Sequence, residues 1–237
     1  MRLNRCFLLI LVLVGSFATF ALADEANEEN LPKVVLVGDS IRMGYAPLVA
    51  ELLKGKANVI SSKTNGGDSA RVLANLDAWV IQEQPAVVHF NCGLHDLKFT
   101  RKTNMPQVPL DQYEANLKAI VERLQKETKA KLIFATTTPI VDERHAKRKG
   151  AFDRQEADVL RYNEVAQKVM KNAGIEINDL HTFVVEQGTE KMLRPDGTHY
   201  SEANSRKLAK LVTDAVSKYL PGDEPSPKAD GATQRVP

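Results

Sequence analysis

Cysteine, excess charge and long apolar runs are all scarce in this chain of 237 residues. The two cysteines form no zinc-type cluster and no HExxH motif is present, so we expect no metal. The 32 basic and 30 acidic residues give a net charge of only +2, which offers no electrostatic footprint for nucleic acid. The GxxxxGKS/T phosphate loop and the dinucleotide glycine fingerprint are also missing, and we therefore expect no cofactor.

The one long apolar stretch lies at the N-terminus. Residues 1–23 begin with two arginines, continue with the apolar run 7–14 and end in Ala21-Leu22-Ala23. This order is typical of a cleaved secretory signal peptide, with an uncleaved membrane anchor as the alternative. Cleavage after Ala23 would leave Cys92 as the only cysteine, so the folded part would have no internal disulfide. We expect a secreted or periplasmic protein without a stable membrane span, with a polar linker at 24–31.

Short apolar segments alternate with amphipathic segments along the rest of the chain. Strands are predicted at 33–38, 57–61, 86–90, 131–136 and 175–177. Helices are predicted at 46–53, 69–82, 110–127, 153–172 and 201–220, the last with Ser201 as its N-cap. This alternation indicates an α/β domain over 32–220, in which helices cover both faces of a five-stranded parallel sheet.

Two long loops and a polar tail complete this organisation. The loops 93–109 and 138–152 both follow predicted strands, which places them at the carboxyl edge of the sheet, where open α/β folds bind ligands. The basic run 144–149 in the second loop is either a solvated loop or a binding site for an anionic glycan. Residues 221–237 contain four prolines and no apolar periodicity, and we expect a disordered tail.

A candidate nucleophile and a candidate base flank this domain. Ser40 follows the first predicted strand in Gly38-Asp39-Ser40, where its hydroxyl would be exposed at the start of a helix. Asp196 precedes His199 by three residues, just before the last helix, so that its carboxylate can fix the tautomer of the imidazole. Either segment taken alone is also compatible with an ordinary turn.

Two further strand ends offer hydrogen-bond donors at the same edge. The segment Asn65-Gly66-Gly67-Asp68-Ser69 follows the second strand, and its paired glycines allow the backbone to approach a ligand closely. The segment 91–96, Asn-Cys-Gly-Leu-His-Asp, follows the third strand. A nucleophile, a base with its acid and two donor groups are the parts required for acyl transfer through a serine. Cys92 is interpreted as a small buried hydrophobe rather than as a nucleophile.

The four segments GDSI, NGGD, GLHD and DGTH occur in the order of the blocks of the SGNH (GDSL-type) hydrolases, and the chain resembles that family from about residue 33 to about residue 219. The resemblance implies a flavodoxin-like three-layer α/β/α sandwich and esterase or acylhydrolase chemistry without a metal. It also implies that Ser40 is the nucleophile, His199 the general base and Asp196 its partner.

The family also implies three donors for the oxyanion of the tetrahedral intermediate. These are the N–H of Ser40, the N–H of a glycine in the second block, for which Gly67 is the better match, and the side chain of an asparagine in the third block. Here His95 stands where the family has that asparagine, and Asn91 lies at the preceding strand end. A neutral imidazole can donate one hydrogen bond, so His95 is favoured and Asn91 is the alternative.

The sequence therefore predicts an exported serine esterase. Its expected substrate is a short acyl ester, such as an O-acetyl group on a carbohydrate, either as a small molecule or on a glycan. One alternative is an O-acyltransferase that uses the same site, and another is a non-catalytic glycan-binding module that keeps the fold.

Overall fold

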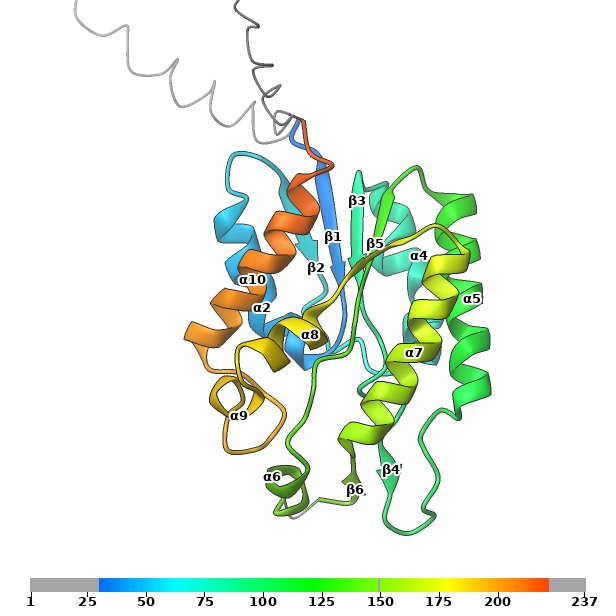
Figure 1. The fold of residues 1–237 in the computed structure, drawn as a ribbon. Coiled ribbons are helices and arrows are strands. Elements are labelled where there is room, and N and C mark those ends of the chain that lie inside the picture. Colours follow the sequence, from blue (N-terminus) through cyan, green and yellow to red (C-terminus); the bar gives the residue numbers. More distant parts are fainter. Residues whose placement is uncertain (1–29, 149, 222–237) are drawn as a thin grey trace, which may run out of the picture. The chain divides into compact units, whose positions relative to one another are not determined.

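A parallel β-sheet forms the centre of the computed structural model, which describes residues 30–148 and 150–221. Its strands are β1 (Lys33–Val37), β2 (Asn58–Ser61), β3 (Val87–Phe90), β5 (Lys131–Ala135) and β7 (Glu176–Asn178). They lie in the order β2-β1-β3-β5-β7, and every neighbouring pair is parallel (Figure 1). Counted consecutively this is the order 2-1-3-4-5 of the flavodoxin-like fold, which confirms the predicted fold class. The predicted signal peptide, most of the linker and the tail from residue 222 lie outside the described residues.

Helices cover both faces of this sheet. They are α2 (Ser40–Leu52), α3 (Ser69–Ala74), α4 (Leu76–Trp79), the 3-10 turn η1 (Ile81–Glu83), α5 (Leu110–Glu127), α6 (Asp142–Ala146), α7 (Glu156–Asn172), α8 (Leu180–Glu186), α9 (Thr189–Met192) and α10 (Glu202–Ser217). Helices α2 and α10 lie on one side of the sheet, and α4, α5 and α7 lie on the other (Figure 1). The helices and the sheet between them form three layers. No helix within the described ranges is both long and apolar enough to cross a bilayer.

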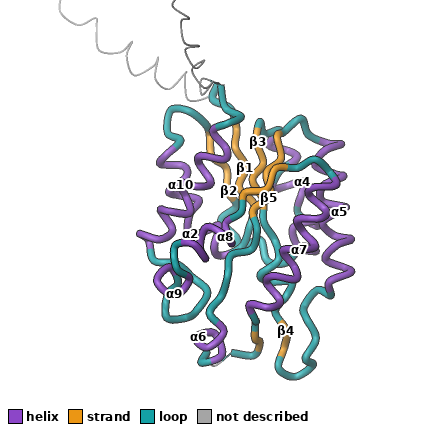
Figure 2. Tube along the Cα trace, in the orientation of Figure 1, coloured by secondary structure: helices purple, strands orange, loops and turns teal. Residues whose placement is uncertain are grey.

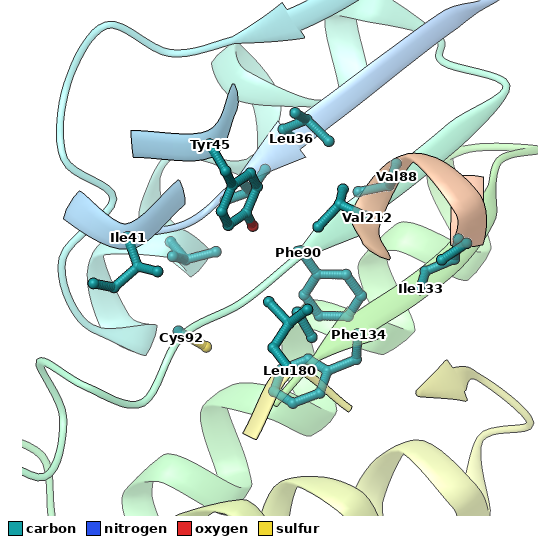
Figure 3. Packing of buried hydrophobic residues seen from close by; sticks show 14 of the residues in the cluster. Leu36, Ile41, Tyr45, Val88, Phe90, Cys92, Ile133, Phe134, Leu180 and Val212 are labelled. Atoms are coloured by element: carbon teal, nitrogen blue, oxygen red, sulfur yellow. The ribbon is translucent and has the colours of Figure 1, made fainter. Parts of the chain in front are cut away.

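The strands are buried because they lie between these helical layers. Each residue of β3 is buried, as are the four residues of β1 that follow Lys33. Figure 3 shows how the aromatic side chains fill the core around them. The rings of Phe90 and Phe134, on neighbouring strands, meet edge to face with their centroids 5.3 Å apart. This packing of apolar strands under helices is what a continuous β-branched run predicts for a parallel sheet.

Two predicted helices differ from those observed. Helix α2 begins at Ser40 rather than at residue 46, because the side chain of Asp39 caps it and Ile41, Tyr45 and Val49 form a buried stripe at helical spacing. Gly44 and Pro47, both poor helix formers, obscure this stripe in the sequence. The single helix predicted at 69–82 is instead divided into α3, α4 and η1.

The two long loops are joined to each other, which the sequence did not indicate. Strand β4 (Phe99–Thr100) from the first loop pairs antiparallel with β6 (Phe152–Asp153) at the end of the second. Both loops lie beyond the carboxyl ends of the central strands, where the connecting segments gather (Figure 2). Helix α6 includes the first half of the basic run 144–149, which was predicted as a loop. The sheet edge that carries the candidate residues is therefore covered by paired, folded segments.

Candidate active site

Ser40 is held at the sheet edge by the junction of β1 and α2. Strand β1 ends at Val37, and Ser40 is the first residue of α2. The carboxylate of Asp39 accepts the N–H of Ile41 at 2.9 Å and so caps this helix. The backbone N–H of Ser40 lies in the first turn, where N–H groups have no partner within the helix. The hydroxyl of Ser40 is only partly buried, and a ligand can therefore reach it.

The imidazole of His199 links Ser40 to Asp196. Ser40 Oγ lies 3.0 Å from His199 Nε2, and His199 Nδ1 lies 2.8 Å from Asp196 Oδ2. A carboxylate only accepts hydrogen bonds, so the contact with Asp196 places the ring proton on Nδ1. Nε2 then carries a lone pair directed at the hydroxyl of Ser40. The structure brings together the three residues that the sequence assigned as nucleophile, base and acid.

Asp196 is kept ionised by its surroundings. Its Oδ1 accepts the backbone N–H groups of Thr198 and His199, each at 2.9 Å. Burial works against the charged form of Asp196, but these hydrogen bonds and that of the His199 ring outweigh it and lower its pKa to about 2. The carboxylate is therefore charged at neutral pH, where it can stabilise an imidazolium on His199.

A glycine fixes the loop that carries this pair. Gly197 has φ +71°, a conformation that favours glycine, and a Cβ there would lie 2.7 Å from the carbonyl oxygen of Val141. The N–H of Val141 donates to the carbonyl of Gly197 at 3.0 Å. The start of α6 thus packs against the Asp196–His199 loop and leaves no room for a side chain at this turn.

Arg42 joins the nucleophile turn to the glycine turn after β2, and sequence reasoning missed it. Its side chain is buried, and its Nε and Nη2 donate to the carbonyl of Gly38 at 3.2 and 3.0 Å. Its Nη1 donates to the carbonyl of Ser62 at 2.6 Å. The same Gly38 carbonyl accepts the N–H of Gly66 at 2.9 Å, and a Cβ on Gly66 would lie 2.6 Å from that oxygen. In the sequence, the only signal for this contact is that Arg42 lies one helical turn after Gly38.

Two of the predicted oxyanion donors already have protein partners. The N–H of Gly67 donates to Asn65 Oδ1 at 2.8 Å. The side-chain amide of Asn91 donates to the carbonyl of Ala135 at 2.8 Å and bridges β3 to β5. Asn91 also lines a cavity of about 10 Å³, the space of one water molecule. The amide of Asn91 is thus engaged in holding neighbouring strand ends together.

His95 is half-buried, and its ring has no hydrogen-bond partner among residues 30–148 and 150–221. Burial is the main influence on its pKa and lowers it, opposed by Asp39 and assisted by Arg154 and Lys98. The ring is therefore neutral at pH 7 and carries one N–H that it can donate. The influence of Asp39 reflects the position of His95 near the start of α2.

The described part of the chain forms no metal cluster at this edge, and Cys92 is not a second nucleophile. Within the described ranges, no group of three or more His, Cys, Asp or Glu side chains is placed to hold a metal ion. The thiol of Cys92 is buried, and burial raises its pKa well above the usual value. Cys92 therefore stays a protonated thiol at neutral pH, and the thiolate required of a nucleophile does not form.

Comparison with known proteins relates the chain to ester hydrolases. The profile of the GDSL-like lipase/acylhydrolase family matches residues 36–207. The chain is 27% identical over 205 residues to the GDSL esterase/lipase CPRD49 of Arabidopsis thaliana, covering 79% of each chain. It is 26% identical over 194 residues to the isoamyl acetate-hydrolyzing esterase 1 homolog of Rattus norvegicus, covering 75% of this chain and 78% of the relative.

Solved structures agree with the fold. The lipase/acylhydrolase from Enterococcus faecalis superposes with a TM-score of 0.68 at 22% identity, over 82% of this chain and all of the other. The acetyl xylan esterase AlAXEase superposes with a TM-score of 0.63 at 21% identity, over 78% of this chain and 99% of the other. At these identities the likeness is one of fold.

Asp96 predicts a pH dependence of stability. Its buried carboxyl group accepts the N–H of Ser69 at 2.9 Å, and burial raises its pKa to about 7. An aspartate in the unfolded chain has a pKa of about 3.9. Between about pH 4 and 7, Asp96 therefore holds a proton in the folded chain that it has lost in the unfolded chain. This group therefore makes the free energy of unfolding fall as the pH rises through that window.

Asp96→Asn removes this titration and should make the slope of unfolding free energy against pH more positive, measured by urea unfolding at several pH values. The control is Asp111→Asn, an exposed acid at the start of α5, which should keep the parental slope. Equal slopes for the parent and Asp96→Asn would show that Asp96 is ionised throughout.

Proposed function

Since the chain belongs to the GDSL-like lipase/acylhydrolase family and is a serine ester hydrolase, we propose that it is exported and removes short acyl groups, such as O-acetyl groups, from carbohydrates. In this proposal Ser40 is the nucleophile, His199 the general base and Asp196 the partner of that base. The observation that carries the assignment is the chain of two contacts, 3.0 Å from Ser40 Oγ to His199 Nε2 and 2.8 Å from His199 Nδ1 to Asp196 Oδ2.

The reaction follows from these contacts. Ser40 Oγ attacks the ester carbonyl carbon while its proton passes to His199 Nε2, and the charged Asp196 stabilises the resulting imidazolium. The imidazolium gives the proton to the alcohol oxygen as the carbon–oxygen bond breaks, which leaves the acyl group on Ser40. His199 then takes a proton from water as the water oxygen attacks the acyl carbon. The imidazolium returns this proton to Ser40 Oγ as the acyl–oxygen bond breaks, which releases the acid and restores the serine.

The oxyanion is held in this proposal by the N–H of Ser40 and the ring N–H of His95. Asn91 is set aside because its amide already donates to the carbonyl of Ala135. The N–H of Gly67 would contribute only by sharing its hydrogen with Asn65 Oδ1. A neutral imidazole at His95 suits the role of oxyanion donor. Its N–H donates a hydrogen bond to the oxyanion, while His199 alone carries the transferred proton.

Separate observations support the acyl group, the carbohydrate and the export in this proposal. Three relatives are named as isoamyl acetate-hydrolyzing esterase 1 homologs, which favours an acetyl group. The carbohydrate follows the solved acetyl xylan esterase, whose likeness is one of fold. Export rests on the order of charged, apolar and small residues in the segment 1–23.

Ser40→Ala should lower the hydrolysis of a small activated acetate ester by roughly 10⁴- to 10⁶-fold, because no other group supplies the nucleophile. The rate is measured on purified protein, with circular dichroism to show that the variant is folded. Ser217→Ala, in the last turn of α10, is the matched control and should keep the parental rate. A Ser40→Ala variant that hydrolyses the ester at the parental rate would exclude Ser40 from the reaction.

His95→Ala should lower kcat by about 10²- to 10³-fold, the usual effect of losing one oxyanion donor. His95→Asn should restore most of the rate, because an amide can donate in place of the ring. Asn91→Ala should instead lower the free energy of unfolding by about 1–3 kcal/mol, since it leaves the carbonyl of Ala135 without its donor. A large loss of kcat in Asn91→Ala together with an unchanged kcat in His95→Ala would reverse the assignment.

A further inference from the structure

Arg154 is a buried cation without an ion-pair partner. Its side chain is 6% exposed, and its guanidinium lies over the ring of Phe152, 4.8 Å from the ring centroid. Its Nε donates to the carbonyl of Leu94 at 2.6 Å. Within residues 30–148 and 150–221, no carboxylate forms an ion pair with it. Burial of a charged group raises the free energy of the folded protein unless an opposite charge is close by. An anion bound to this guanidinium would therefore be stabilising.

Two more cations gather at the same ring. Lys98 Nζ lies 5.2 Å from the centroid of Phe152, and the guanidinium of Arg148 lies 5.9 Å from it. Arg148 Nη1 is buried and has no hydrogen-bond partner in the described part of the chain. The neighbouring acid, Asp153, is taken by Arg101, whose Nε and Nη2 bind it at 2.7 and 2.8 Å. We call Lys98, Arg148 and Arg154 the Phe152 cluster.

The Phe152 cluster lies beside the candidate active site. Arg154 holds the carbonyl of Leu94, the residue directly before His95. Leu94 and Asp39 line the same small cavity, and Asp39 directly precedes Ser40. Strand β6, which carries Phe152, lies beyond the carboxyl ends of the central strands (Figure 1). Asp39 is also near enough to Arg154 to raise the pKa of its guanidinium. In our proposal the alcohol portion of an ester bound at Ser40 extends toward these cations.

The charge of Arg154 persists at the pH of catalysis. Burial lowers the pKa of its guanidinium, opposed by Asp39, to about 10. The group is therefore protonated at neutral pH. Its Nε is already engaged by Leu94, which leaves the two terminal nitrogens as a planar pair that matches a carboxylate. Asp39 offsets part of the charge of Arg154, but among the described residues no carboxylate forms an ion pair with any of the three cations. Their charge and the planar donor pair of Arg154 favour a single anionic group over a neutral sugar hydroxyl.

We propose that the Phe152 cluster binds a carboxylate on the alcohol portion of the substrate, so that the preferred substrate is an acylated uronic acid. This inference rests on the proposed function, since it names the substrate class of the same site. The carboxylate would pair with Arg154, and Lys98 and Arg148 would add charge around it.

The test uses two esters that differ only in the carboxylate. One is a monoacetylated methyl glucuronoside, and the other is the methyl glucoside acetylated at the same hydroxyl. The parent should hydrolyse the uronate with a kcat/KM about ten- to hundredfold higher, because a hydrogen bond to a charged group has an effect of this size. The ratio should fall as the ionic strength rises, since salt screens partly exposed charges.

Arg154→Gln should bring the ratio of the two kcat/KM values close to one. Because Arg154 also supports the carbonyl of Leu94, Lys98→Gln serves as a second variant on a less buried residue, and it should lower the ratio severalfold. Lys102→Gln removes the same charge from an exposed position after β4 and should keep the parental ratio.

The outcomes separate this inference from the proposed function. Equal hydrolysis of both esters by the parent, or an unchanged ratio in both Arg154→Gln and Lys98→Gln, would overturn the carboxylate site and leave the esterase proposal intact. Hydrolysis of neither ester would count against the carbohydrate substrate. In that case Ser40→Ala is titrated with methyl glucuronoside and methyl glucoside by calorimetry: selective binding of the uronate supports the cluster, and equal or absent binding overturns it.

Discussion

The hydrogen bond between Ser40 Oγ and His199 Nε2 joins side chains 159 positions apart in the chain, and the rest of the site depends on it. Only a fold that brings the segments around Ser40 and His199 to one edge can form this contact. The parallel sheet does so because Ser40 follows the carboxyl end of β1 and the loop before α10 returns to the same edge. The packing of α10 against α2 then fixes the base relative to the nucleophile. The packed core therefore holds Ser40 and His199 close enough for the proton transfer between them.

Side-chain hydrogen bonds to backbone carbonyls hold the site in place around that contact. Arg42 binds the carbonyls of Gly38 and Ser62, Asn91 binds that of Ala135, and Arg154 binds that of Leu94. Each bond joins two segments at this edge and satisfies a polar group that burial would otherwise leave without a partner. A site held in this way needs little rearrangement during the reaction, which is how preorganised donors stabilise developing charge.

The sequence predicted the parts of this molecule that are encoded locally. The strand runs, the cap at Ser201 and the pairing of Asp196 with His199 all depend on residues close together in the chain. What it did not predict depends on distant partners. The pairing of β4 with β6 and the carbonyl contacts of Arg42 and Arg154 have no signature in composition or periodicity. The start of α2 was also missed, because glycine and proline hide its buried stripe. The described residues do not include the predicted signal peptide, which stays a prediction.

The most direct test of the account is covalent labelling of the full chain with a fluorophosphonate, which reacts only with an activated serine. We predict one phosphonyl group per molecule, located on Ser40 by peptide mass spectrometry, and a much slower reaction in His199→Ala. An unlabelled Ser40 in folded protein, or a label on another residue, would contradict the claim that His199 activates this hydroxyl.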